Sequence, residues 1–266
     1  MTRPVHLPDF TNPPLDEVVL GVQFSPVPSY SSVDAKDVWS LFRADFPRVE
    51  EQLPLPPQFE TFGGLNPQAG FQFQLSQLPP GTRQWFNSAD GNQLIQFQPD
   101  RFLTNWRKLQ GLQPYPRYES ISEAFERNLA KLRAHLLTAK SYDLEINQAE
   151  IIYINIIPMA ETLDVDKWVS FWQAPLAEIE LINLQLTQVI RNENGHPEAR
   201  LHHEVQTVAS LDGKNKALRL NLIYRGKPRG SAIADAMEFL SRGREVIVTR
   251  FAEITTKHAQ TVWGRK

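Results

Sequence analysis

The residues from Asp100 to Lys108 form the densest polar and aromatic cluster in the sequence. The run DRFLTNWRK places an acid, an amide, an indole and three basic side chains within nine positions. They are Asp100, Arg101, Asn105, Trp106, Arg107 and Lys108. Guanidinium groups bind carboxylates and phosphates through paired hydrogen bonds. The cluster therefore predicts a site for a small anion, a nucleotide or a partner's carboxylate, to which Arg117 could contribute.

A structural role for the same residues is the alternative. Trp106 would then be a core residue, and Arg101 and Arg107 would pair with nearby carboxylates such as Asp100 on a solvated strand. Two basic residues on the polar face of a strand are common. The cluster alone therefore does not establish a binding site.

A second candidate site is the acidic pair Glu50 and Glu51, which precedes the run LPLPP. Consecutive X-Pro steps disfavour helix, so this segment is predicted to be extended. Paired acids beside a stiff extended run could form a docking epitope for another protein. The alternative is a charged loop edge that prevents association. The sequence places no second catalytic group beside these carboxylates.

Glutamines gather in the predicted strands between residues 71 and 98. They are Gln72, Gln74, Gln84, Gln93, Gln96 and Gln98. An amide both donates and accepts hydrogen bonds, so such a face suits the backbone of a partner or a polar ligand. The alternative is the neutral, solvent-facing side of a half-buried sheet.

The tripeptide His202-His203-Glu204 is a weak candidate for metal binding. Neighbouring strand residues face opposite ways, so His202 and Glu204 point to one side and His203 points inward. Two ligands do not make a metal site, and we expect none. The sequence has no cysteine and no P-loop, GxGxxG, GxSxG, HExxH or EF-hand pattern. We therefore expect no cofactor and assign no enzyme class.

The elements that would position these residues can be predicted from apolar periodicity. Strands are expected at Val18–Phe24, Phe71–Leu75 and Phe102–Lys108, with Phe102, Thr104 and Trp106 on the core side of the last. The dipeptide Asp90-Gly91 predicts a hairpin with a type I′ turn. A helix capped by Asp34 should end at Pro47.

A long helix is expected to open at Ser120 or Ser122 with an apolar stripe from Ile121 to Leu136. The following segment Ile146–Ile157 is apolar on both faces, which predicts a central or doubly covered strand. The remaining elements predicted are a short helix at Asp166–Trp172, strands at Asn183–Ile190, Leu201–Ala209 and Ala217–Arg225, helices at Ser231–Leu240 and Glu245–Ile254, and a final turn at Thr255–Trp263. The dipeptides Asn194-Gly195 and Asp212-Gly213 would join the three strands.

This order of elements predicts an α+β protein with antiparallel sheets and helices packed on one face. A strand, a helix, several strands and a long helix occur once before residue 143 and again after it. We therefore expect two pseudo-repeated halves, residues 1–142 and 143–266, that together form one compact unit. Near the C-terminus, Trp263 is expected to dock onto the body of the protein or a symmetry-related subunit, because an indole is costly to leave exposed.

Net charge and hydropathy argue against two kinds of partner, nucleic acid and membrane. The net charge is -2 and the pI is about 6.3, so binding to nucleic acid is not expected. No apolar run is long enough to span a membrane. The N-terminal MTRPVHLPDFTNPP lacks the apolar core of a signal peptide, which predicts a cytoplasmic protein by elimination.

Several segments resemble one family when they are taken in order. They are NPPLDEVVLGVQFSP, FPRVEEQLPLPP, DGNQLIQFQPDRFLTNWRK followed by YPRY, and REVIVTRFAEITTKHAQTVWGRK. Together they are similar to the "sporadically distributed" family of bacterial proteins, which has no assigned enzymatic activity. The patchy occurrence that this resemblance implies suggests genes that move horizontally, as accessories of defence or toxin-antitoxin systems do.

We therefore expect a binding or regulatory protein whose main partner is another protein or a second copy of itself. A domain that binds or converts a small anion or nucleotide is the alternative. The first would use the glutamine-rich face and the acidic, proline-stiffened segment. The second would join Arg101, Asn105, Arg107, Lys108 and Arg117 in one pocket.

Overall fold

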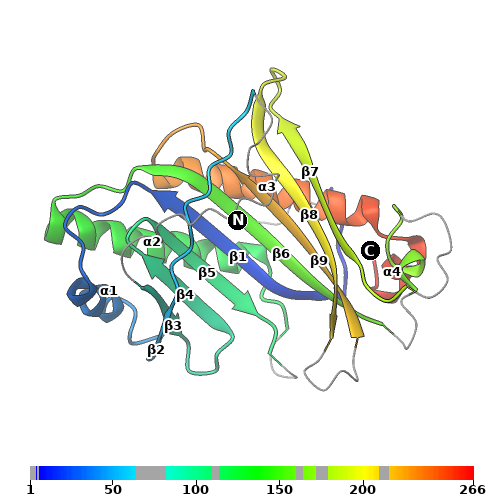
Figure 1. The fold of residues 1–266 in the computed structure, drawn as a ribbon, viewed down its shortest axis with the longest axis horizontal. Coiled ribbons are helices and arrows are strands. Elements are labelled where there is room, and N and C mark those ends of the chain that lie inside the picture. The colour runs from blue at the N-terminus through cyan, green and yellow to red at the C-terminus, as the bar shows by residue number, and fades with distance from the viewer. Residues whose placement is uncertain are drawn as a thin grey trace.

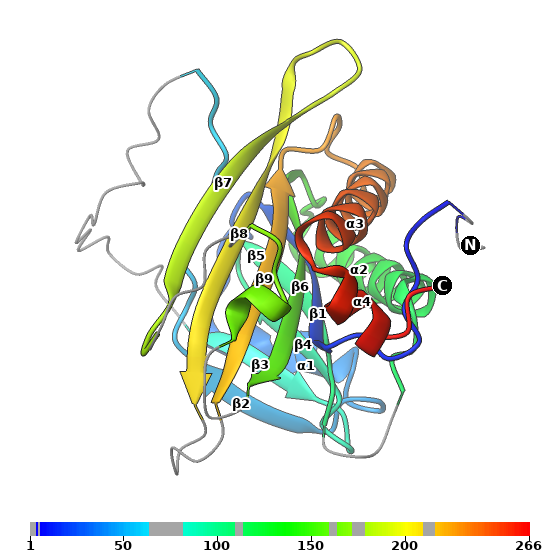
Figure 2. The same ribbon diagram turned by 90° about the vertical axis from the view of Figure 1, so that its right-hand side faces the viewer.

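The computed structural model describes residues 4, 6–63, 82–109, 114–159, 164–171, 179–209 and 216–266. Within these ranges one antiparallel sheet of nine strands runs through the protein, and two long helices lie behind it (Figures 1 and 2). The strands are β1 (Leu15–Phe24), β2 (Arg48–Gln52), β3 (Arg83–Asn87), β4 (Gln93–Gln98), β5 (Arg101–Arg107), β6 (Ile146–Met159), β7 (Asn183–Arg191), β8 (Pro197–Ala209) and β9 (Lys216–Gly226). The helices are α1 (Ala35–Ser40), α2 (Tyr118–Lys140), α3 (Ile233–Ile254) and α4 (Lys257–Val262).

The strand order is β2-β3-β4-β5-β1-β6-β9-β8-β7. β1 and β6 lie in the middle and pair along nearly their whole length. This confirms the central position predicted for Ile146–Ile157, whose apolar residues need neighbours on both faces. The predicted boundary between residues 142 and 143 falls between α2 and β6, and both halves contribute to the same sheet.

The core lies between the sheet and the helices. Side chains at alternate positions of β1, namely Val18, Leu20, Val22 and Phe24, are all buried there. The apolar stripe of α2 from Ile121 to Leu136 is buried against them, as its helical spacing predicts. Figure 2 shows α2 and α3 side by side on this face of the sheet, while the opposite face carries no helix of the described residues.

The predicted type I′ turn at Asp90-Gly91 is wrong. Only Gly91 has a positive φ, of 78°, and the loop spans Ser88–Asn92. The Ser88 hydroxyl donates to Asp90 Oδ1 at 2.7 Å and accepts from the Gln93 N–H at 3.0 Å. This side-chain bridge stabilises a longer loop than the dipeptide alone would indicate.

Three helix predictions also need correction. α2 begins at Tyr118, earlier than Ser120. Only a 3-10 turn, Val165–Lys167, lies in the predicted helix Asp166–Trp172, and Trp172 lies outside the described residues. The two predicted C-terminal helices are one continuous helix, α3. It continues through Gly243, where an added Cβ would lie 2.5 Å from the Tyr224 ring, so the glycine permits close packing on the sheet.

Two further predictions, a hairpin and a helix cap, are confirmed. β7 and β8 form a hairpin through Asn194-Gly195, with Gly195 at a φ of 78°. The Thr256 hydroxyl caps α4 by accepting from the Ala259 N–H at 3.1 Å. The predicted helix capped by Asp34 and ending at Pro47 is wrong: only the short helix α1 follows Asp34, and the Asp34 carboxylate accepts from the Ser31 N–H instead of capping it. The predicted strand Phe71–Leu75 and the dipeptide Asp212-Gly213 lie outside the described residues.

The two ends of the described chain are tied together beside α3. Backbone hydrogen bonds join Thr11 to Gly264, Asn12 to Trp263 and Lys266 to Asp9. Trp263 is buried and stacks on Phe251 at 5.3 Å and on Trp168 at 5.7 Å between ring centroids. The predicted docking of Trp263 onto the body of the protein is confirmed. Among the described residues, no helix has the length and apolar character needed to cross a membrane.

Candidate functional site

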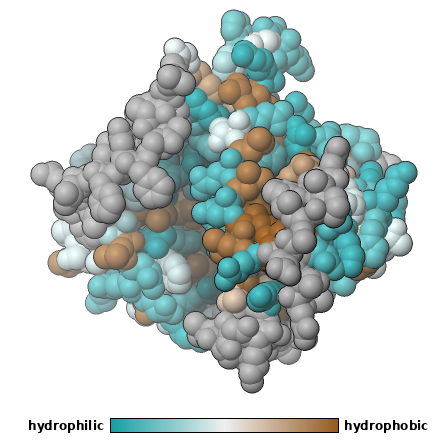
Figure 3. Space-filling view, turned by 45° about the vertical axis from the view of Figure 1, so that its right-hand side comes forward, coloured by the Kyte–Doolittle hydropathy of each residue, from teal (hydrophilic) through white to brown (hydrophobic). Residues whose placement is uncertain are grey.

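The face of the sheet opposite the helices is lined by polar side chains. Strand register places one next to another across six strands, from β4 to β8. They are Gln98, Arg101, Gln23, Gln148, Glu150, Arg225 and Arg200, where Gln148 is paired with Gln23 and Glu150 with Arg225. The face is not uniformly polar: Figure 3 shows apolar residues gathered in a hollow, with hydrophilic ones on both sides. The register places Ile152 and Ile223 on this face.

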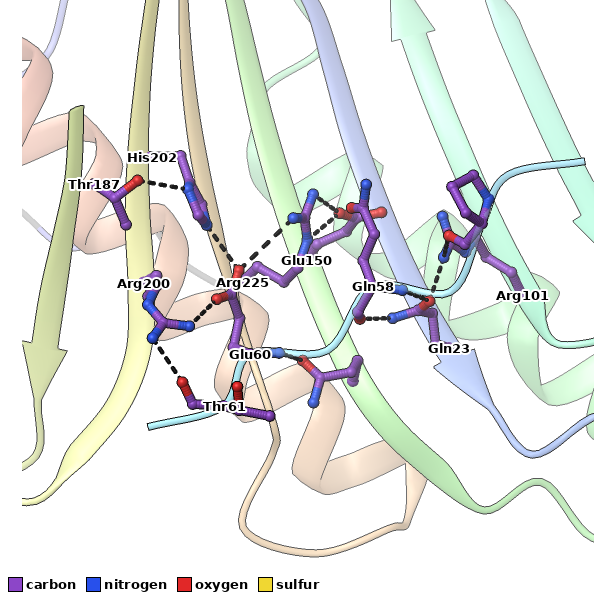
Figure 4. A network of polar contacts seen from close by, with 12 residues as sticks. Gln23, Gln58, Glu60, Thr61, Arg101, Glu150, Thr187, Arg200, His202 and Arg225 are labelled. Atoms are coloured by element: carbon purple, nitrogen blue, oxygen red, sulfur yellow. Dashed lines mark hydrogen bonds and ion pairs between the residues drawn. The ribbon is translucent and has the colours of Figure 1, made fainter. Parts of the chain in front are cut away.

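A segment without regular secondary structure, Leu53–Gly63, follows β2 and crosses this face (Figures 1 and 4). We call it the strap. It contains the run LPLPP and thus the docking epitope predicted from the sequence. The extended conformation expected from its prolines is confirmed, and the surface that it contacts belongs to this same chain.

Glutamine side chains hold the strap by its backbone. The Gln98 amide donates to the Leu55 carbonyl at 3.0 Å and accepts from the Leu55 N–H at 2.9 Å. The Gln23 amide does the same at Gln58, accepting from its N–H at 2.9 Å and donating to its carbonyl. The sequence predicted that an amide-rich face would suit a peptide backbone, and these contacts are of that kind. Here the backbone is intramolecular.

Arg101 is buried under the strap. Its Nη2 donates to the Pro56 carbonyl at 2.9 Å and to the Gln23 side chain. Burial lowers the pKa of Arg101, while the charges of Glu150 and Asp100 oppose that shift. Both interpretations of Arg101 made from the sequence, an anion site and an ion pair on a solvated strand, are wrong. The side chain is buried under the strap and is open neither to solvent nor to an anion.

Glu60 is the most heavily bonded residue of the strap, and its side chain is only 5% exposed. Its carboxylate accepts from Arg200 at 2.5 Å and contacts His202 Nε2 at 2.7 Å, and Arg225 lies 3.7 Å away (Figure 4). Burial alone would raise the pKa of Glu60. The hydrogen bonds from His202 and Arg200 and the charge of Arg225 outweigh it, so the pKa lies below its ordinary value.

Arg200 is bound by three neighbours along the strap. Besides Glu60, it donates to the Thr61 carbonyl at 2.6 Å, and its guanidinium lies over the Phe62 ring at 4.7 Å. Arg225, besides lying near Glu60, pairs with Glu150, with 2.7 Å between Nη2 and the carboxylate oxygen. The cations Arg200 of β8 and Arg225 of β9 are therefore neutralised by carboxylates of the sheet and of the strap.

The rest of the predicted cluster divides between the two faces. Asn105 and Arg107 lie on the polar face: Asn105 donates to Glu17 at 2.6 Å, and Arg107 donates to Asn87 and to the Gly91 carbonyl, both at 2.9 Å. Trp106 faces the core, where its ring lies 5.1 Å from that of Tyr115. This alternation follows the prediction from strand periodicity.

The two charges at the ends of the cluster have local roles. The Asp100 carboxylate accepts from the Gln98 amide at 2.6 Å, which helps to orient that amide toward the strap. Lys108 is exposed at the end of β5, where its backbone N–H donates to the Asp16 carbonyl at 2.6 Å. Neither side chain joins the others in a pocket.

Glu50 and Glu51 point to opposite faces of β2. Glu50 accepts from Asn87 at 3.1 Å on the strap side, and Glu51 accepts from Gln84 at 3.4 Å on the other. Gln96 and Gln98 lie on the polar face, whereas the register places Gln84 and Gln93 on the other. Gln72 and Gln74 lie outside the described residues.

The histidines take the orientations predicted from strand alternation. His202 contacts Glu60 and the Thr187 hydroxyl, while His203 is buried on the other face, with its Nδ1 3.4 Å from the Leu186 carbonyl. Burial lowers the pKa of His203. Across the part of the chain that the structure describes, no group of His, Asp and Glu side chains could hold a metal ion.

Arg117 lies on the helix side of the sheet, away from Arg101 and Arg107. It precedes α2, has a positive φ of 75° and pairs with Asp9 at 2.9 Å. It also lines a cavity between the N-terminal segment, α2 and α3. The predicted joint site of Arg101, Asn105, Arg107, Lys108 and Arg117 is therefore wrong, because the sheet separates its members.

Sequence reasoning missed Glu60 in the strap and the residues that bind it, namely Arg200, Arg225 and Gln148, whose side-chain oxygen accepts from the Glu60 N–H at 3.4 Å. A signal was present for Arg200, which lies between the core residues Ala199 and Leu201 of β8 and so points to the opposite face. What the sequence lacks is any indication that a loop after β2 would reach β8. A scan against models of protein families and a search of curated proteins found no match to this chain.

Proposed function

We propose that this is a protein-binding protein that presents the strap to its partner. The supporting observation is the exposure of apolar side chains on a segment whose backbone is held to the sheet. Leu53 is 76% exposed and Phe59 is 47% exposed, and Pro56 and Pro57 between them are exposed as well. Exposed apolar residues gathered on one ordered segment are typical of interaction sites.

The contacts of the strap favour presentation over simple packing. Side chains of the sheet bind the backbone at Leu55, Pro56, Gln58 and Thr61, so the strap is fixed without burying its apolar side chains. A segment already held in its bound conformation loses less entropy when a partner binds. Proline-rich extended segments are commonly bound in grooves lined by aromatic side chains. The partner proposed has such a groove, with basic residues near Glu50.

Capture experiments with matched variants test this proposal. The full chain would be immobilised and exposed to lysate of its source cells, beside a Leu53→Ser, Phe59→Ser variant. A Leu186→Ser, Val189→Ser variant removes exposed apolar side chains of β7 instead and serves as control. A stoichiometric partner should bind the wild type and the control and be lost from the strap variant. No stoichiometric partner, or one that the strap variant retains, would contradict the proposal.

The biological role of the protein is a separate proposal. The resemblance to a sporadically distributed bacterial family supports a role as an accessory of a mobile defence or toxin-antitoxin system. The absence of cysteine suits the reducing cytoplasm. Defence or toxin genes beside the coding gene in several genomes would support this setting, and a neighbourhood of unrelated housekeeping genes would argue against it.

We also propose that the two halves of the chain are structural repeats with helices on one face. Outward from the centre of the sheet, one half reads β1, β5, β4, β3 and the other reads β6, β9, β8, β7. Each half has a long helix after its strands, α2 or α3, and α4 follows α3 in the second half. Superposition of the halves in an experimental structure would test the idea, and equivalent strands that fail to overlie would refute it.

A further inference from the structure

A cavity on the helix side of the sheet lies apart from the strap. It is enclosed by the N-terminal segment before β1, the start of α2, β6 and α3. Its free volume is about 70 Å³, counted over the positions that the centre of a water molecule can take. This is several times the roughly 10–15 Å³ that one water needs. The cavity can therefore hold a small organic molecule.

Most of the cavity wall is apolar. Phe10 and Leu15 line it from the N-terminal side, and Ile247 and Phe251 line it from α3. The backbone hydrogen bonds that tie Thr11 and Asn12 to the C-terminal residues hold this N-terminal segment in place. The body of a ligand here would be apolar, because polar groups facing these walls would lose their hydrogen bonds.

Arg244 is one of the charged residues in this wall, with Asp9, Arg117 and Glu119. Its side chain is only 8% exposed, yet its ion pair with Glu119 is 3.4 Å long, and its guanidinium lies 5.4 Å from the centroid of the Tyr118 ring. A guanidinium has five N–H donors. Among the described residues only Nη2 has a hydrogen-bond partner, and the residue lines the cavity. A buried cation with unused donors is suited to a carboxylate.

The tyrosines add neutral hydrogen-bonding groups to the same cavity. The hydroxyls of Tyr115 and Tyr153 lie 3.2 Å apart, so one donates to the other and the second has a proton to offer. The Tyr118 hydroxyl is buried without a well-formed hydrogen bond, although Ser122 lies close enough to affect its pKa. Burial raises the pKa of Tyr115 to about 12, so its hydroxyl stays protonated at neutral pH.

We propose that this cavity binds a small monocarboxylate with an apolar body, whose carboxylate pairs with Arg244. The proposal is independent of the strap, which lies on the other face. A dianion such as a phosphate monoester fits less well, because the carboxylates of Glu119 and Asp9 also line the cavity and would repel a second negative charge.

Calorimetric titration of the full chain with benzoate, hexanoate, benzamide and phenyl phosphate tests the ligand class. At least one of the two carboxylates should bind, and phenyl phosphate should bind more weakly than that carboxylate. Benzamide should bind more weakly than benzoate by about ten-fold or more, since a hydrogen bond to a charged group is lost. Binding of neither carboxylate at concentrations up to about 10 mM, equal binding of benzamide and benzoate, or tighter binding of phenyl phosphate would overturn the proposal.

Two variants identify the residue. Arg244→Gln should weaken binding of the carboxylate by roughly ten- to hundred-fold. Arg242→Gln removes a half-exposed arginine of the same helix and should leave the affinity unchanged. An Arg244→Gln protein that is folded and binds as tightly as the wild type would overturn the assignment. If that variant does not fold, the comparison of benzoate with benzamide on the wild type still decides.

Discussion

Each face of the sheet buries an arginine, and the two are bound in different ways. Arg200, on the strap side, is 7% exposed and has an ion pair at 2.5 Å, a carbonyl at 2.6 Å and an aromatic ring against it. Arg244, on the helix side, is 8% exposed and has one ion pair at 3.4 Å and one more distant ring. Similar burial is therefore accompanied by closer contacts for Arg200 than for Arg244.

The difference indicates a different role for the arginine on each face. A charge removed from water must be compensated by hydrogen bonds and opposite charges. On the strap side, the compensation comes from Glu60, which lies far away in sequence, so the arginine holds the chain together. On the helix side, the partner Glu119 is 17% exposed and Arg244 lines a cavity. There the arginine retains the capacity to bind another molecule.

Removing the charge of Glu60 should have the largest effect. Glu60→Gln leaves Arg200, Arg225 and His202 without their shared carboxylate, and breaking a buried pair costs about 3–5 kcal/mol. Glu119→Gln, the matched change on the helix side, should cost about 1 kcal/mol or less, because its pair is long and partly solvated. Urea denaturation of both variants would measure the difference. Equal losses would remove the contrast between the two faces.

Shortening the chain by Val262 to Lys266 should have the next largest effect. It removes the buried Trp263, whose burial contributes on the order of 2–3 kcal/mol. At roughly 2–4 °C for each kcal/mol in a protein of this size, the thermal midpoint should fall by several degrees. The truncation also removes the backbone hydrogen bonds that hold the N-terminal segment beside the cavity. A truncated protein with unchanged melting and unchanged mass in solution would show that the tail contributes nothing.

Acid should weaken the strap side first. The pKa of Glu60 is lower in the folded protein than its ordinary value of 4.5, so its contribution to stability is complete above pH 4.5 and is lost as the pH falls through the lower, folded value. Urea denaturation at a series of pH values would measure this contribution. Glu60→Gln should lack that part of the acid dependence. A variant with the same acid profile as the wild type would show that Glu60 is not the group responsible.

High pH should act on the helix side of the sheet, where the tyrosines lie, and we expect its effect to be smaller than that of the changes above. All six tyrosines pack against the core on the helix side, and burial raises the pKa of each above 10. Tyrosinate absorbance of the native protein at pH 10 should therefore be well below that of the protein in denaturant. Stability should fall as the pH rises above 10, because the unfolded chain ionises first. Native and denatured titration curves that coincide would contradict this packing.

The strands and their faces could largely be predicted from the sequence, since alternation in β1 and β5 depends only on neighbouring residues. The pocket predicted for the cluster could not, because its members come from both sides of the sheet. Trp106 illustrates the success: its position in the strand alone assigned it to the core. Arg117 illustrates the failure: closeness in sequence to Arg107 concealed that the sheet lies between them.

What the sequence determined by itself are the local features: the alternating faces of the strands, the apolar stripe of α2, the extended strap and the docking of Trp263. Each follows from backbone geometry or from the cost of exposing an apolar side chain. The tertiary structure decided which distant residues meet. Glu60 contacts Arg200 across 140 positions, and Arg244 contacts Glu119 across 125. Contacts at such separations depend on the order of strands in the sheet, which local periodicity does not encode.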